Sequence, residues 1–197
     1  MEAAIRRFDE LNGQDPNVEQ VDDVSHPREL LYAKRLTEWV SRLCPGASIE
    51  LQLAARCQHL CRWMIPRQSH AEGRTGYLQW RNKLKRFHAD KAGEILRELG
   101  FDEAVIRRVQ ELNLKKPFPE DPESRVLEDA LCLVFLQYQF TEFAARKKDE
   151  LLVGILRKTW QKMTDAARRE ALRLPCGKRE AALLRQALDG FPDGSRN

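Results

Sequence analysis

The sequence predicts an all-α fold, a single globular domain of about eight or nine helices, and three observations support it. Apolar residues recur at three- and four-residue steps along most of the chain, as they do on the buried face of a helix. No segment of the sequence sustains the apolar and polar alternation of a half-buried strand. Glycine and proline number only 10 and 9 in 197 residues, which disfavours disorder and turn-rich β-folds.

Capping residues and prolines predict where the helices begin and end. Pro27 suits the first turn of one helix, and Ser48 suits the N-cap of another that runs to about Ile65. A basic loop then leads to a long helix that starts near Gly76, for which Gly100 is a candidate left-handed cap. The other helices are expected over residues 2–12, 102–112, 122–145, 149–163, 164–174 and 178–189.

Length and composition predict one domain over residues 1–197, because a chain of this size holds about one hydrophobic core. Residues 1–26 form an acidic N-terminal segment whose second half, 14–26, is expected to be a loop. Residues 190–197 are expected to be a flexible tail. No apolar run approaches the ~20 residues that cross a membrane, and the N-terminus lacks a secretory pattern. We therefore expect a soluble, intracellular protein with no membrane partner.

Positive charge gathers in the middle third of the sequence. Nine Lys or Arg residues and two acidic residues lie between Arg56 and Lys91, although the whole chain has a net charge of only +4. Arginine grips phosphate and carboxylate groups bidentately, and aromatic rings stack on bases or guanidinium planes. This pattern predicts that the protein binds an anionic ligand, either a phosphorylated small molecule, a nucleotide or RNA. The predicted contacts are Arg62, Trp63, Arg67, Arg74, Tyr77, Trp80, Arg81 and Lys158.

Two histidines and one aspartate are candidate ligands of a divalent metal. His59 flanks the apolar stripe of its helix and His88 lies within the stripe of the next one, so sequential helices are expected to bring them together. Asp129 is in register with Leu133 and Phe140, on a face where a charge must be paired, hydrogen-bonded or metal-bound. A structural ion pair and a hydrogen-bonded core histidine remain the alternatives to metal binding.

Several stretches of the chain resemble an uncharacterised family that is catalogued as domain of unknown function 4202. They lie within residues 27–175 and read ELLYAKRLTEWV, LAARCQHLCRWMIPR, GRTGYLQWRNKLKRFHA, LEDALCLVFLQYQF and ILRKTWQKMT. The resemblance indicates the family but implies no activity.

The order of the polar residues is more remotely similar to the HD superfamily of metal-dependent phosphohydrolases. That similarity implies an all-helical fold in which His59 matches the first histidine and Asp129 the last aspartate. His88 then matches either the His-Asp doublet or an additional ligand. No histidine of this chain is followed directly by aspartate, and His88 and Asp90 diverge by about 200° around a helix.

Three functions follow from these patterns. The first is a binding protein that clamps an anionic ligand or nucleic acid with its arginines and histidines. The second is an HD-like phosphohydrolase in which a bound divalent metal activates water. The third is a scaffold that contacts protein partners within a larger assembly, such as a ribonucleoprotein.

Overall fold

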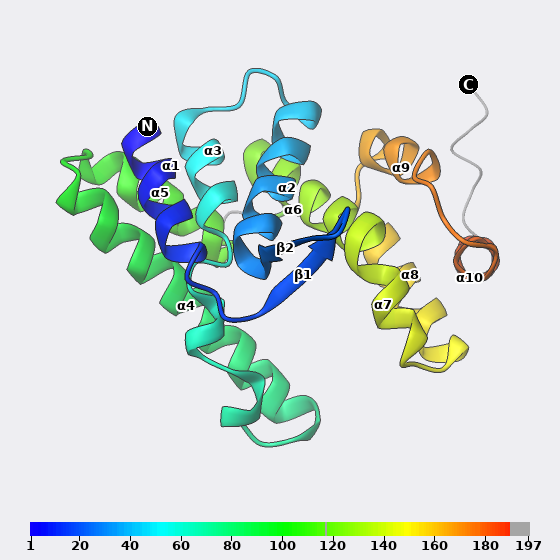
Figure 1. Ribbon diagram of the computed structural model, residues 1–197. Helices are drawn as coiled ribbons and strands as arrows, with labels where there is room; N and C mark the ends of the chain where they lie inside the picture. The colour runs from blue at the N-terminus through cyan, green and yellow to red at the C-terminus, as the bar shows by residue number, and fades with distance from the viewer. Residues whose placement is uncertain (117, 190–197) are drawn as a thin grey trace. The chain divides into compact units, whose positions relative to one another are not determined.

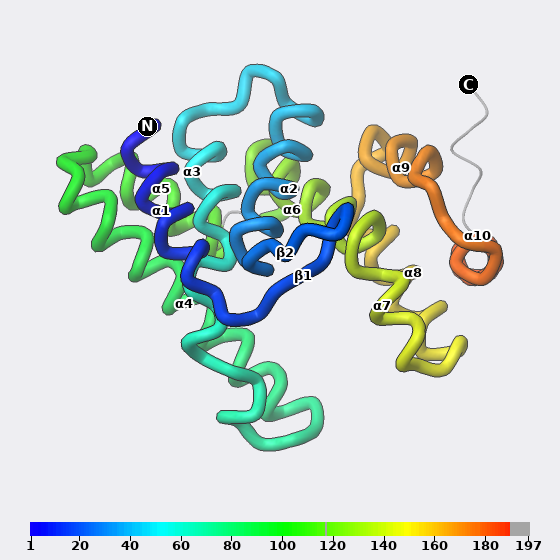
Figure 2. Tube along the Cα trace, viewed as in Figure 1, coloured from blue at the N-terminus to red at the C-terminus, as the bar shows by residue number. Residues whose placement is uncertain are grey.

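The computed structural model describes residues 1–116 and 118–189, which form ten α-helices and a small β-hairpin (Figure 1). The predicted all-α fold class is confirmed. The chain divides into two compact units, Met1–Leu127 and Glu128–Asn197, and the course of the backbone through each can be followed in Figure 2. The predicted flexible tail, 190–197, lies outside the described residues.

The described residues of the first unit build its core from six helices. They are α1 (Glu2–Asn12), α2 (Arg28–Leu43), α3 (Ile49–Cys57), α4 (Gly73–Glu98), α5 (Glu103–Leu114) and the first part of α6 (Pro122–Val134). Helix α3 packs against α2 and α5, and α4 packs along α5. The apolar stripes predicted from the sequence supply the core of this unit, in which Leu36, Leu53 and Ile95 are buried.

The second unit continues α6 and then adds four helices. A π-helical turn, η3 (Phe135–Gln139), joins α6 to the next helix. The added helices are α7 (Phe140–Ala145), α8 (Asp149–Lys162), α9 (Asp165–Leu172) and α10 (Lys178–Leu188). Helix α8 packs against α10, and Phe140, Leu152 and Leu183 belong to the hydrophobic cluster between them.

The stretch 14–26, predicted to be a loop, contains a two-stranded antiparallel sheet. Strand β1 (Val18–Val21) pairs with β2 (Val24–Pro27) across the two turn residues Asp22 and Asp23, whose φ angles are 49° and 61°. A two-residue hairpin turn of type I′ has positive φ at both positions, and aspartate tolerates this better than most residues. Each strand has only four residues, which is too short for a sustained alternation to show in the sequence.

The helix predicted to run to about Ile65 ends earlier, at Cys57. The backbone then turns, and Cys61 adopts a left-handed φ of 54° before the short 3-10 turn η1 (Arg62–Met64). The side-chain oxygen of Asn12 accepts a hydrogen bond from the Cys61 backbone N–H at 3.1 Å. Asn12 of α1 thus accepts a hydrogen bond from a backbone N–H that a continuing helix would have bonded internally. Helical periodicity cannot predict this contact, because the two residues are far apart in the sequence.

Residues 62–86, named the arm below, consist of η1, η2 (Arg67–Ser69) and the first half of α4. In Figure 1 the arm extends downward from the other helices of the first unit. The indole N–H of Trp80 donates to the Ile65 carbonyl at 2.8 Å and so fastens α4 to the preceding segment. Gly76 permits a close crossing, because a Cβ atom there would lie 1.9 Å from the Ala71 carbonyl oxygen.

Other predicted features of the fold are confirmed. Ser48 caps α3 by accepting a hydrogen bond from the Leu51 N–H at 3.1 Å, and Gly100 ends α4 with a φ of +76°. Within the described part of the chain, no helix has both the length and the apolar character needed to cross a membrane.

Candidate functional site

A buried carboxylate near the start of α2 lies at the centre of the candidate site. Glu29 is only 7% exposed, and its backbone N–H donates to the Asp15 carboxylate at 3.0 Å. Asp15 therefore caps α2 and fixes the helical turn that carries Glu29. Burial raises the pKa of Glu29 to about 7, with the positive charge of Arg62 opposing the rise and the Asp15 charge adding to it. Glu29 thus changes its charge near neutral pH.

His59 contacts Glu29 through one ring nitrogen and Arg62 through the other. Its Nδ1 lies 3.2 Å from Oε2 of Glu29, and its Nε2 lies 3.4 Å from Nη1 of Arg62. Because an arginine N–H only donates, Nε2 accepts, and the neutral ring carries its proton on Nδ1 and donates it to Glu29. Burial lowers the pKa of His59 well below its usual value, and the charges of Arg62, Lys115 and Arg81 lower it further. The ring is therefore uncharged at neutral pH.

Arg62 connects this pair of residues to the arm. Its Nε lies 3.6 Å from Oε1 of Glu29, and its guanidinium lies over the Trp80 ring, 4.8 Å from the centroid. The side chain of Arg62 is 32% exposed, compared with 21% for His59 and 9% for Glu29. A ligand that arrives from solvent therefore meets Arg62 and His59 before it meets Glu29.

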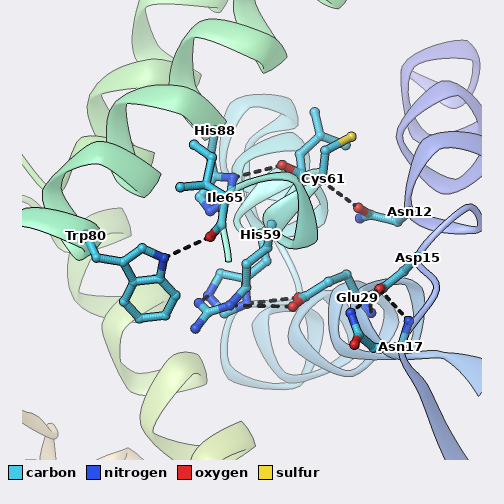
Figure 3. A network of polar contacts seen from close by, with 11 residues as sticks. Asn12, Asp15, Asn17, Glu29, His59, Cys61, Ile65, Trp80 and His88 are labelled. Atoms are coloured by element: carbon cyan, nitrogen blue, oxygen red, sulfur yellow. Dashed lines mark hydrogen bonds and ion pairs between the residues drawn. The ribbon is translucent and has the colours of Figure 1, made fainter. Parts of the chain in front are cut away.

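His88 of α4 lies beside His59, as the sequence predicts. Figure 3 shows His59 between His88 and Glu29, and the two imidazole centroids are 5.8 Å apart. His88 is 3% exposed, and its Nδ1 donates to the Leu60 carbonyl at 2.8 Å. Burial, followed by the neighbouring His59, lowers the pKa of His88 to about 3. We call Glu29, His59, Arg62 and His88 the polar cluster.

Four of the predicted ligand contacts lie together at the edge of the polar cluster. Arg62 lies over Trp80, and the guanidinium of Arg81 lies 5.8 Å from the centroid of the Tyr77 ring. The rings of Tyr77 and Trp80 are 6.0 Å apart, so the two cation–π pairs form one continuous group.

The other predicted ligand contacts lie elsewhere. Arg67 donates to two carbonyls of the loop that follows it, at 3.0 and 2.9 Å, and so holds the arm together. Arg74 is exposed and Trp63 is half-buried, both within the arm. Lys158 is exposed on α8, in the second unit. Their roles in ligand binding stay predictions.

Asp129 belongs to the second unit, where Thr164 engages both of its oxygens. The backbone N–H of Thr164 donates to Oδ1 at 2.9 Å, and its hydroxyl donates to Oδ2 at 2.5 Å. This carboxylate, only 4% exposed, thus has the hydrogen-bond donors that its burial requires. Among the residues that the structure describes, no group of three or more His, Cys, Asp and Glu side chains is arranged to hold a metal ion. Metal binding by His59, His88 and Asp129 stays a prediction.

Glu29 is not among the site residues predicted from the sequence, although the pattern that could have identified it is present. Glu29 lies on the buried stripe of α2 together with Tyr32, Leu36 and Trp39. An acidic residue in register with apolar ones is the same signal that singles out Asp129. The ring of Tyr32, one turn further along the stripe, stacks on His59 with centroids 4.0 Å apart.

These features define an all-helical protein whose first unit holds a partly exposed cluster of ionisable side chains. The chain belongs to the family described as Domain of unknown function (DUF4202), which matches residues 2–184 and so extends over both units. A search of curated proteins and a search of solved structures each found no match. The remote similarity to HD phosphohydrolases stays a prediction.

Proposed function

We propose that the first unit binds a phosphorylated small molecule at Arg62 and Arg81, beside His59. The observation that carries the proposal is the balance of charge around His59. Burial lowers the pKa of His59, and the charges of Arg62, Lys115 and Arg81 lower it further, whereas the neighbouring acid, Glu29, is only partly ionised at neutral pH. A bound anion would compensate this positive charge.

The two arginines are held in place by aromatic rings before any ligand binds. Arg62 lies over Trp80 and Arg81 over Tyr77, at 4.8 and 5.8 Å from the ring centroids. A side chain that is already ordered loses less conformational entropy when it binds a ligand. Arg81 is exposed, and no acidic group of the described residues lies within ion-pair distance of it. Its charge is therefore available to a ligand.

The contact between Arg62 and Glu29 is long, so a ligand phosphate could replace Glu29 as the partner of Arg62. At 3.6 Å it is longer than the about 2.7–2.9 Å typical of a charge-assisted hydrogen bond. A phosphate group that accepts two N–H bonds from the same guanidinium would make a stronger contact than this carboxylate does.

Calorimetric titration with inorganic phosphate and with glycerol 3-phosphate, at low ionic strength, tests the proposal. We expect both to bind, and we expect Arg62→Gln and Arg81→Gln each to weaken binding by about tenfold or more. Lys83→Gln is the matched control, because it removes the same charge from an exposed position of α4 only two residues from Arg81. The proposal is wrong if neither probe binds or if all three variants weaken binding equally.

A further inference from the structure

We infer that His88 is a second contact of the same ligand, accepting a hydrogen bond from a ligand hydroxyl through Nε2. This inference rests on the proposed anion binding at Arg62 and Arg81, and it narrows the ligand to phosphorylated molecules that carry a free hydroxyl. Polyol phosphates and sugar phosphates belong to this class.

The tautomer of His88 makes Nε2 an acceptor. Its Nδ1 lies 2.8 Å from the Leu60 carbonyl oxygen, which only accepts, so Nδ1 carries the proton of the neutral ring. Nε2 then presents a lone pair, and among the described residues no donor reaches it. The side chain is 3% exposed, so bulk water gives this lone pair little compensation. Native proteins seldom bury an acceptor in this way, and such an atom calls for a partner.

The polar groups next to His88 are engaged with other partners: Arg62 contacts Nε2 of His59 through Nη1 and Oε1 of Glu29 through Nε. The N–H of His59 is directed to Glu29, and the other ring nitrogen of His59 is itself an acceptor of Arg62. Nε2 of His59, itself an acceptor, therefore cannot donate a hydrogen bond to Nε2 of His88. The fully ionised phosphate group of a ligand cannot donate one either, because its oxygens only accept hydrogen bonds. A hydroxyl on the same ligand can donate the hydrogen bond that Nε2 of His88 lacks.

The arrangement of the cluster fits such a ligand. His59 contacts the half-buried Arg62 through Nε2, and its ring centroid lies 5.8 Å from that of the buried His88 (Figure 3). A ligand that contacts both Arg62 and His88 would therefore lie beside His59. Besides its contact with the Trp80 ring, Arg62 meets His59 and Glu29 at 3.4 and 3.6 Å, distances long enough for a phosphate to compete with them for the guanidinium.

The test compares two probes that share the phosphate and the three-carbon chain. Glycerol 3-phosphate carries two hydroxyls and n-propyl phosphate carries none. We expect the wild-type protein to bind glycerol 3-phosphate at least about tenfold more tightly in calorimetric titrations. His88→Asn keeps an N–H for the Leu60 carbonyl and removes the Nε2 acceptor. This variant should bind n-propyl phosphate as the wild type does and lose the preference for glycerol 3-phosphate.

A second measurement keeps the inference testable if His88→Asn does not fold. The ¹⁵N resonance of His88 Nε2 in the wild-type protein should move toward lower frequency when glycerol 3-phosphate is added, and should stay in place with n-propyl phosphate. Equal binding of the two probes, or an unchanged resonance, overturns the role of His88 and leaves anion binding at the arginines intact. Failure of both probes to bind overturns the proposed function and this inference together.

Discussion

Glu29 and Asp129 are both buried carboxylates on apolar helix faces, at 7% and 4% exposure, yet they are held in different ways. The oxygens of Asp129 accept hydrogen bonds of 2.9 and 2.5 Å from Thr164. The oxygens of Glu29 face His59 at 3.2 Å and Arg62 at 3.6 Å. Asp129 is therefore fixed by a backbone N–H and a hydroxyl of a helix N-cap, whereas Glu29 is held by long contacts to side chains that are able to move.

The difference teaches that burial of an acid does not by itself indicate a functional residue. Short bonds to Thr164 stabilise the start of α9, because they satisfy donors at a helix terminus. Burial raises the pKa of Glu29 to about 7, and its longer contacts leave its partners able to bind something else. Of the two, Glu29 has the properties of a site that responds to ligand or pH.

The largest effect that tests this comparison is expected from Glu29→Gln. The folded-state pKa of about 7 lies above the usual 4.5, so the folded protein holds this proton more tightly than the unfolded chain does. Ionisation of Glu29 therefore lowers the free energy of unfolding, and the full loss is present above pH 7. The loss becomes smaller as the pH falls from 7 toward 4.5. Because glutamine resembles the protonated acid, the variant should raise the free energy of unfolding by about 3 kcal/mol at pH 8 and by almost nothing near pH 4.5.

Urea unfolding at several pH values measures this effect. Glu38→Gln is the control, since Glu38 is an exposed acid on the same helix, and its effect should stay within about 0.5 kcal/mol. A Glu29→Gln protein that is less stable than the wild type at pH 8 would show that the contacts to His59 and Arg62 outweigh the cost of burial.

The opposite sign is expected from the equivalent change at the other carboxylate. Asp129→Asn replaces two acceptor oxygens by one, whereas Thr164 offers two donors. We expect the free energy of unfolding at pH 8 to fall by about 1–2 kcal/mol. Asp165→Asn is a matched control at the start of the same helix, with a side chain 78% exposed, and should change little. If Asp129→Asn also stabilised the protein, the distinction between the two carboxylates would not hold.

Helical periodicity predicts most of the fold because it records which faces are buried within each element. It places Leu36, Leu53 and Ile95 in the core, and the structure agrees. It fails where a distant residue decides the local backbone. The left-handed Cys61 depends on the side chain of Asn12, which is 49 positions away, and neither residue is a glycine or proline that would mark a break.

The same limit applies to the candidate site. The sequence predicts that His59 and His88 are neighbours, because two consecutive helical segments carry them, and the structure places them together. It does not predict Glu29 as their partner, since that contact joins α2 to the turn after α3 across 30 positions. Both Glu29 and Asp129 are acidic residues in register with the apolar residues of a helix. Only the lengths and partners of their contacts distinguish them.

The smallest effect is expected in the pH dependence of anion binding. When Glu29 loses its proton it competes with a bound anion for Arg62, so binding should weaken as the pH rises through about 7. Sulfate is the appropriate probe, because its charge does not change between pH 6 and 8. We expect its affinity to fall by up to about tenfold over this range in the wild-type protein.

Glu29→Gln removes the competitor, so sulfate affinity in this variant should be nearly independent of pH and close to the wild-type value at pH 6. His59 adds no pH dependence of its own here, because its pKa lies well below its usual value and it stays neutral throughout. Asp129→Asn should keep the wild-type pH dependence of sulfate affinity, because the carboxylate it removes accepts hydrogen bonds from Thr164, whereas the carboxylate that meets Arg62 is that of Glu29. A flat wild-type profile, or one that survives Glu29→Gln, would mean that Glu29 does not compete for the arginine. The two buried acids would then differ in the stability that they confer and not in their relation to the ligand.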